Sequence, residues 1–312
     1  MAQGKRVPAG TERCSLCGEP PVILLNNPER HLCAAHLVAE VEERVAQTIR
    51  ERELIKPHDR IAVALSGGKD STALLVILSR LLPVWEDVRL VAITVDEGIA
   101  GYRDDTIRAA EDLTRKTGTE HVCISFKDLI GDDLDALLVG RETQACSVCG
   151  ILRRKALSVA AYKAGAARIA TGHNLDDEAQ SVLMNTLRGD LPRLVRTSDA
   201  DSSDCFIPRI KPLADIAEKE IAAYLFVQDL FPFLPECPYT RYALRLEVRS
   251  MLSALEQKHP GTMRNLIKSK RAIEKQVGRS AMSEPLKRCQ QCGDPCSGEL
   301  CQVCSLRQSL GK

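Results

Sequence analysis

The stretch Ile61-Ala62-Val63-Ala64-Leu65-Ser66-Gly67-Gly68-Lys69-Asp70-Ser71 decides the fold. Its first five residues are apolar and small or branched, which predicts a buried parallel strand. The apolar run over residues 72–78, after the two glycines, predicts a helix. A strand, a glycine-rich turn and a helix start together form an anion cradle, because backbone N–H groups and the helix N-terminus can then approach a phosphate.

The polar residues of this turn indicate which phosphate compound it holds. Lys69 can neutralise phosphate charge, and the serines can donate hydroxyl hydrogen bonds, but the Walker A spacing does not fit. The turn resembles the SGGxDS signature of the PP-loop ATP pyrophosphatases, which implies that ATP is split to AMP and pyrophosphate while a substrate is adenylated. The alternative is a surface turn with a helix cap. The ATP-binding residues expected here are Ala64, Ser66, Gly67, Gly68, Lys69, Asp70 and Ser71.

Composition narrows the class of protein. The chain has 312 residues, which predicts more than one structural unit, and 27% charged with 44% hydrophobic residues is typical of soluble proteins. We expect no membrane segment, and a cytoplasmic location, because neither a spanning apolar run nor a signal-peptide core is visible. A net charge of +1 does not by itself predict a nucleic-acid partner. The 13 cysteines favour metal or reactive sulfur over disulfides.

Further apolar runs extend the pattern into an α/β fold. Residues 90–95, 121–126 and 168–171 predict three more strands, and helices are predicted between them at about 104–116 and 147–164. This alternation predicts a doubly wound parallel sheet, whose ligands bind at the carboxyl ends of the strands. Asp96 would lie at that edge, and Cys123 would be a core thiol.

A second motif follows the fourth predicted strand. The run Thr171-Gly172-His173-Asn174-Leu175-Asp176-Asp177 resembles the TGHNxDD segment of tRNA-modifying PP-loop enzymes. Gly172 would allow close approach to the nucleotide, and Asp176 or Asp177 could hold Mg²⁺. His173 is either an acid–base group or a packing residue, and Asn174 with Asp177 also fits a helix capping box. We expect Asp96, Arg153, Gly172 and Asp177 to complete the ATP and Mg²⁺ site.

Cysteine pairs at both ends of the chain have the spacing of zinc ligands. The N-terminal set is Cys14, Cys17, Cys33 and His36; the C-terminal set is Cys289, Cys292, Cys301 and Cys304. Four ligands in two close pairs suit tetrahedral zinc and leave no position open for substrate, so we expect two structural Zn²⁺ sites. His31 and Cys296 are the spare candidates, and buried free thiols are the alternative interpretation.

A third group, the cysteine trio, consists of Cys146, Cys149 and the distant Cys237. With the trio included, nearly the whole chain resembles the tRNA 2-thiouridine synthetases of the TtcA/TtuA group, in the TtuA and NcsA branch. The resemblance implies that the trio holds a [4Fe-4S] cluster with one iron open to sulfide. Persulfide or disulfide chemistry, a third zinc site and inert thiols are the alternatives.

From residue 240 onward the chain turns basic. Arg241, Arg245 and Arg249 recur on one predicted helical face, and more cations follow at Arg264, Lys268, Lys270, Arg271 and Lys275. Such a stripe suits RNA phosphates, although most charge runs are solvated helix faces. The expected units are a zinc finger (1–38), a PP-loop domain (39–236), a basic helical segment that contacts tRNA (237–284) and a zinc ribbon (285–312).

The expected activity is ATP-dependent 2-thiolation of a tRNA uridine, with Lys69, Asp70, Cys146 and Cys237 as the catalytic residues. The family resemblance implies a ubiquitin-like thiocarboxylated sulfur carrier or another sulfide donor, and a homodimer. One alternative is a different PP-loop reaction, such as lysidine formation or ammonia-fed amide synthesis, which needs no cysteine trio. Another is a zinc-ribbon RNA-binding protein whose nucleotide site is not catalytic.

Overall fold

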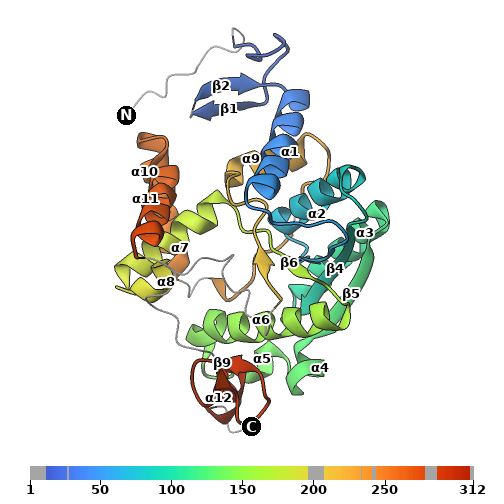
Figure 1. Cartoon of the computed structure of the whole chain (residues 1–312), viewed down its shortest axis with the longest axis vertical. Helices are drawn as coiled ribbons and strands as arrows, with labels where there is room; N and C mark the ends of the chain where they lie inside the picture. The colour runs from blue at the N-terminus through green and yellow to red at the C-terminus, as the bar shows by residue number, and fades with distance from the viewer. Residues whose placement is uncertain are drawn as a thin grey trace.

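A parallel sheet of five strands, in the order β5-β4-β3-β6-β7, forms the centre of the molecule (Figure 1). The computed structural model describes residues 12–26, 28–195, 207–232, 234–240, 244–277 and 287–309. The α/β prediction is confirmed, and the four predicted strands are present. The fifth, β7, has two residues, too few for a periodic pattern. The strands are β3 (Arg60–Ala64), β4 (Arg89–Asp96), β5 (Glu120–Ser125), β6 (Arg168–Ala170) and β7 (Arg209–Ile210).

The order of the strands sets where a ligand can bind. The chain enters the sheet at β3, adds β4 and β5 on one side, and then returns to add β6 and β7 on the other. The topological switch point therefore lies between β3 and β6, and ligands of such sheets bind outside the carboxyl ends of the strands there. The two sequence motifs at residues 66–71 and 171–177 follow these two strands.

Helices cover both faces of the sheet (Figure 1). Side chains alternate between the faces of a strand, so Ile61 and Val63 pack in one buried cluster and Ala62 in the other. The first cluster contains residues of α1 (Ala34–Glu51), α2 (Lys69–Leu81), α3 (Arg103–Thr117) and α9 (Glu218–Phe226). The second contains residues of α5 (Leu134–Leu137) and α6 (Ala145–Lys163).

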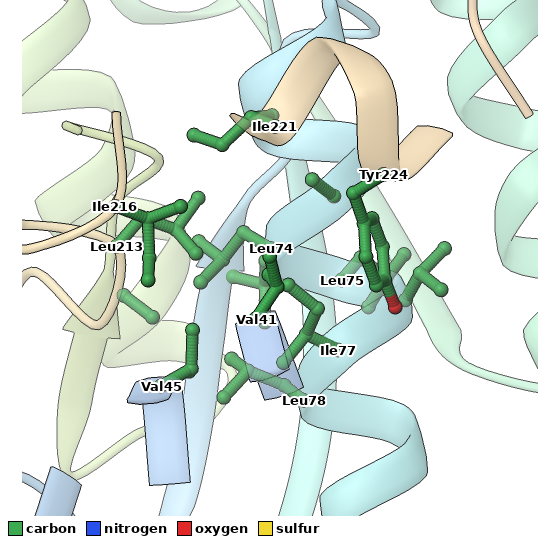
Figure 2. Packing of buried hydrophobic residues seen from close by; sticks show 14 of the residues in the cluster. Val41, Val45, Leu74, Leu75, Ile77, Leu78, Leu213, Ile216, Ile221 and Tyr224 are labelled. Atoms are coloured by element: carbon green, nitrogen blue, oxygen red, sulfur yellow. The ribbon is translucent and has the colours of Figure 1, made fainter. Parts of the chain in front are cut away.

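Helix α2 is the centre of the first cluster. Figure 2 shows its Leu74 and Ile77 between Val41 of α1 and Tyr224 of α9. The Tyr224 hydroxyl donates to Glu42 Oε1 at 2.7 Å, so its buried polar atom has a partner. Burial of each large apolar side chain contributes roughly 1.5–3 kcal/mol to the stability of the fold. This packing fixes the position of α2, whose first turn carries the glycine-rich loop.

Four further helices form a smaller group beside the sheet (Figure 1). Three of them share a separate apolar cluster that includes Ala179, Val248, Leu252 and Ile267, and the fourth, α8 (Leu191–Val195), contacts two of these three. The expected basic segment is therefore packed on the helix that follows the second motif. The four helices are α7 (Leu175–Leu187), α8 (Leu191–Val195), α10 (Leu244–Lys258) and α11 (Thr262–Val277).

The two ends of the chain pack on opposite sides of the sheet. The hairpin of β1 (Ile23–Asn26) and β2 (Glu29–Leu32) contributes Leu25 and Leu32 to the first cluster. Helix α1 runs through the expected boundary between residues 38 and 39. The C-terminal β8 (Lys287–Arg288), β9 (Pro295–Cys296) and α12 (Gln302–Ser309) lie beside α6 (Figure 1).

Several details differ from the sequence predictions. The prediction that Cys123 is a core thiol is wrong, because Cys123 is exposed. It lies on the edge strand β5, and its side chain points to the opposite face from Val122 and Ile124, which pack against the second cluster. Phe126 begins α4 (Phe126–Ile130) and does not end the strand, because Ser125 forms a capping box with Asp128. Two 3₁₀ turns are Leu82–Val84 and Glu142–Gln144.

Arg241, a predicted member of the basic stripe, lies outside the described residues. In the described part of the chain, no helix is both long enough and apolar enough to cross a membrane.

Candidate functional site

The nucleotide loop, Ser66–Ser71, is closed by its own serines. The Ser66 N–H donates to Ser71 Oγ at 3.2 Å, and the Ser71 hydroxyl donates to the Gly68 carbonyl at 2.9 Å. Gly68 caps α2 without a side-chain hydrogen bond. The first N–H groups of α2 are therefore left for an anion, and the helix dipole adds positive charge at the same end.

Two glycines hold this loop against its neighbours. Gly67 has φ +86°, and a Cβ built on it would lie 2.2 Å from the carbonyl oxygen of Thr106. A Cβ on Gly172 would lie 3.0 Å from the backbone of Asp70 and Ser71. Both positions need glycine because protein backbones approach each other closely here. The second motif therefore lies directly against the nucleotide loop.

Lys69 lies between two carboxylates. Its Nζ is 2.9 Å from Asp70 Oδ2 and 2.7 Å from Glu218 Oε1. Burial lowers the pKa of Lys69, but the two carboxylates outweigh it and the net shift is upward. The side chain is therefore cationic, and a phosphate would compete with Glu218 for it. Asp70 is also held from the second motif, since Asn174 Nδ2 donates to Asp70 Oδ1 at 3.0 Å.

The acidic groups expected to serve Mg²⁺ have protein partners. Asp96 ends β4 and accepts the Gly98 N–H at 2.9 Å. Asp177 completes the capping box of α7 and lies 3.0 Å from Arg245 of α10. An ion at Asp177 would therefore have to displace an arginine.

His173 and Asp176, two further polar groups of the second motif, also have protein partners. His173 is exposed, and its Nδ1 lies 2.8 Å from Thr171 Oγ1. Asp176 accepts the backbone N–H of Glu218 at 2.8 Å, and burial raises its pKa.

The cysteine trio meets at the start of α6. Cys146 is exposed, Cys149 is buried one turn later, and Cys237 packs against the same apolar cluster as Cys149. Burial raises the pKa of Cys149 to about 11; Arg153 opposes this rise, while Glu97 and the other two thiols add to it. The three thiols therefore share one environment.

The trio is more open than the terminal sets. Among the described residues, only the two terminal sets bring all their ligand atoms within 4.8 Å of one another. Wider spacing suits a cluster, because three thiolates on three irons of a cube stand farther apart than thiolates on one ion. The trio therefore fits an iron–sulfur cluster better than a third zinc ion.

An ion-pair chain, buried at Glu97 and Arg103 and exposed at Arg153, joins the nucleotide loop to the trio. Glu97, 2% exposed, lies 2.7 Å from Arg103 and 2.7 Å from Arg153. Arg103 donates to the Ser66 carbonyl at 3.2 Å, and Arg153 donates to Cys149 Sγ at 3.3 Å. Arg153, expected at the ATP site, therefore contacts the trio. Attraction to Glu97 raises the pKa of Arg153 above its ordinary value.

The N-terminal set has the geometry of a tetrahedral metal site. Cys14 and Cys17 flank a turn, and Cys33 and His36 lie at the start of α1. Zn–S bonds of ~2.3 Å and Zn–N bonds of ~2.0 Å in a tetrahedron imply S···S distances of ~3.8 Å and S···N distances of ~3.5 Å. The Cys17–Cys33 sulfurs are 3.7 Å apart, and Cys14 Sγ is 3.5 Å from His36 Nδ1.

Backbone donors favour thiolate in the N-terminal set. Burial raises the pKa of Cys14, but N–H groups of Cys33, Leu16 and Cys17 outweigh it and lower the pKa to about 6. His31 lies outside the set, 3.4 Å from Glu12. The spare histidine is therefore not needed as a ligand.

The C-terminal set is equally closed. Cys292 and Cys301 sulfurs are 3.6 Å apart, and backbone N–H groups, led by that of Cys301, lower the pKa of Cys289 to about 6. Cys296 lies outside the set and donates to the Gly298 carbonyl at 3.2 Å. Val303 packs on the cluster that contains α6, and Lys155 of α6 pairs with Asp294. This unit therefore lies against the helix that carries two of the trio.

The basic stripe divides into two groups. Arg245 and Arg249 are paired with Asp177 and with Glu218 at 3.0 and 2.7 Å. Lys270 is paired with Glu274. Four other cations line one cavity of about 400 Å³ on α11: Arg264, Lys268, Arg271 and Lys275.

Three residues of this site were not predicted from the sequence. Glu97 and Arg103 form the buried ion-pair chain, and Glu218 pairs with Lys69 from the start of α9. Glu97 could have been found, because a carboxylate directly after a strand lies at the ligand-binding edge. No local signal marks Glu218, which the tertiary structure brings to Lys69.

Comparisons with known proteins agree with this geometry. A family model described as a PP-loop domain matches residues 37–249. The tRNA 2-thiolation protein NcsA of Haloferax volcanii is 36% identical over 317 aligned positions, covering 95% of this chain and 98% of the relative. The cytoplasmic tRNA 2-thiolation protein 1 of Mus musculus is 36% identical over 289 positions, covering 90% of this chain and 68% of that protein.

A solved structure is similar over the full length. It is the U34-tRNA thiolase NcsA from Methanococcus maripaludis with its [4Fe-4S] cluster, at 32% sequence identity. It superposes with a TM-score of 0.85, and the match covers 97% of each chain. The similarity thus extends beyond the PP-loop core to both terminal units.

Proposed function

Because this chain belongs to the PP-loop tRNA 2-thiolation family, we propose that it replaces the O2 oxygen of a tRNA uridine with sulfur. In the first step, O2 attacks the α-phosphate of ATP and pyrophosphate leaves. In the second, sulfide attacks C2 and the C2–O2 bond breaks, so that AMP departs with the oxygen. The products are 2-thiouridine in tRNA, AMP and pyrophosphate.

The nucleotide loop provides electrostatic stabilisation in the first step. The N–H groups at the start of α2 and the cationic Lys69 face the charge that grows on the phosphates. Asp70 and Asp177 offer oxygen ligands for Mg²⁺. Because Glu218 and Arg245 now neutralise Lys69 and Asp177, ATP and Mg²⁺ would exchange these partners for their own charges.

The cysteine trio serves the second step. A [4Fe-4S] cluster held by Cys146, Cys149 and Cys237 would keep one iron free of protein ligands, where sulfide can bind. Arg153 lies beside Cys149 and adds positive charge that favours the thiolate form of that ligand. Cys146, the exposed member, is the one that solvent reaches most easily.

The observation that supports this proposal most strongly is the ion-pair chain Arg103–Glu97–Arg153. It connects the carbonyl of Ser66 to the sulfur of Cys149. The adenylating loop and the sulfur-binding helix are thereby held as one unit. A protein that only bound RNA and nucleotide would have no need for this connection.

The terminal sets would each hold one structural Zn²⁺, since four soft ligands within 4.8 Å satisfy a tetrahedral ion. We further propose that the sulfur donor is a thiocarboxylated ubiquitin-like carrier or another sulfide source. A cytoplasmic location fits the names of several relatives. A homodimer is also proposed, from family resemblance.

The decisive experiment is anaerobic purification followed by metal analysis and a thiolation assay. We expect about four irons per chain with visible absorption, together with two zinc ions and tRNA-dependent release of pyrophosphate. Full activity in an iron-free preparation would instead favour persulfide chemistry on the trio. Pyrophosphate release that does not depend on tRNA would contradict the proposed reaction.

A further inference from the structure

Helix α11 carries a row of cations on a single face. Arg264, Lys268, Arg271 and Lys275 follow one another at intervals of four, three and four residues, which places them on one side of an α-helix. All four line the same cavity of about 400 Å³. Its apolar lining is Leu175, Ile267 and Ala272.

Within the described part of the chain, three of the four cations in this row lack the counter-charges found elsewhere in the basic segment. The single carboxylate that lines the cavity is Asp215, which already pairs with Arg52 and, at 3.2 Å, with Arg271. Among the described residues, no carboxylate forms an ion pair with Arg264, Lys268 or Lys275. By contrast, Lys270 on the opposite side of α11 is neutralised by Glu274.

Like charges that share a cavity repel one another, so an anion that enters would relieve that repulsion. We propose that this cavity is a binding site for consecutive phosphates of the tRNA backbone. The inference rests on the proposed function, since it assigns the phosphate contacts of the proposed tRNA substrate to named residues.

The length of the row favours a polyanion over a free phosphate. From Arg264 to Lys275 the helix rises roughly 17 Å, farther than one phosphate group reaches. Lys268, Arg271 and Lys275 are exposed, and they are therefore accessible to a large ligand. Long cationic side chains on an exposed helix suit a backbone that is contacted without base readout.

The position of the cavity also suits the proposed reaction. Leu175, which lines it, is the first residue of α7, and Asp177 lies in the same first turn. RNA bound along α11 would thus lie beside the edge of the sheet that carries the nucleotide loop. A uridine released from its stack would have a short path to that edge.

The test is the binding of the full-length, anaerobically purified protein to an unmodified tRNA transcript at a series of salt concentrations. The double variant Lys268→Gln/Lys275→Gln removes two cations of the row, and Lys270→Gln is the matched control. We expect the salt-dependence slope to fall by about 1 per lysine. Affinity should fall roughly twofold to fivefold per lysine, with KM raised and kcat kept, while the control stays at the wild-type values.

Each contrary outcome has a distinct meaning. Unchanged tRNA affinity and slope in the double variant, with wild-type thiolation intact, would overturn this inference and leave the proposed function standing. Unchanged tRNA binding with impaired delivery of sulfur from a carrier protein, or weakened binding of pyrophosphate alone, would also overturn it. If the double variant loses tRNA affinity but the wild-type protein never thiolates tRNA, the site stands and the proposed function fails.

Discussion

The terminal cysteine sets and the internal cysteine trio both begin with C-x₂-C pairs, but the chain assembles them differently. Each terminal set gathers four ligands within 4.8 Å from a turn and a nearby helix start. In both sets the backbone N–H groups of the ligand turns lower one thiol pKa, at Cys14 and at Cys289, to about 6. In the same sets the thiol pKa values of Cys17, Cys292 and Cys304 are raised, so the local backbone favours thiolate at one ligand of each set.

The trio combines segments that lie far apart in the sequence. Cys149 is buried against the sheet, and burial raises its pKa to about 11. Cys237 comes from a segment far along the chain, and burial raises its pKa as well. The comparison teaches that short-range geometry builds a structural metal site, whereas a reactive sulfur site depends on long-range packing and on a nearby cation such as Arg153.

The largest expected effect comes from removing one member of the trio. Cys149→Ser should reduce thiolation to background and remove iron, because two thiolates cannot hold three irons of the cluster. Zinc content should stay at two per chain, since the terminal sets are separate. Metal analysis and a thiolation assay on the same preparation measure the metal content and the activity. Loss of zinc together with iron would show that the terminal sets and the trio are not independent.

The next effect concerns the ion-pair chain that supports the trio. Glu97→Gln leaves Arg103 and Arg153 without their shared carboxylate and should cost about 3 kcal/mol of unfolding free energy, as for other buried pairs. Urea unfolding measures this loss. The control is Glu120→Gln, which removes a largely exposed pair with Arg60 and should cost less than about 1 kcal/mol. Equal losses would mean that the buried chain has no special role.

Chelation of zinc should separate the two terminal sets. The small buried cluster of the C-terminal unit consists of Cys289, Cys301 and Cys304, so residues 287–309 should unfold without metal. The N-terminal hairpin should persist in part, because Leu25 and Leu32 belong to the main core. Amide hydrogen exchange should show unfolded-peptide rates at the C-terminal unit and partial protection at β2. Equal protection at both ends after chelation would contradict this difference.

The smallest effect is expected at the cysteine just outside the C-terminal set. Cys296→Ala should change unfolding free energy by less than about 0.5 kcal/mol and leave zinc content unchanged. Its thiol donates to the Gly298 carbonyl, and Cys296 packs beside the set without being one of the four ligands. Thermal unfolding and zinc analysis check this, and a loss of zinc would mean that Cys296 replaces one of the four.

Much of the fold could be predicted because its signals are local. The apolar run before Ser66 and the two glycines predict the central strand and the nucleotide loop, and both are present in the structure. The two-residue β7 and the exposure of Cys123 could not be predicted, since strand order decides which strand lies at an edge. The roles of the candidate site residues remain predictions.

Local sequence patterns also could not predict which charged groups form ion pairs with each other. The basic stripe of the sequence looks uniform, yet the structure pairs Arg245 and Arg249 with carboxylates near the nucleotide loop. Four cations of α11 instead line a cavity. Ion pairs between distant segments depend on which surfaces meet, and spacing along the chain carries no information about that.

The sequence by itself determined the chemistry that the protein can perform: a phosphate cradle, two sets of metal ligands and a cysteine pair at a helix start. These features need only short-range geometry, which turns and helix starts encode directly. Only the tertiary structure decided that Cys237 joins Cys149 and that Glu97 links Arg103 to Arg153. Contacts of this kind depend on which buried apolar faces pack against each other, and that depends on the packing of the whole chain.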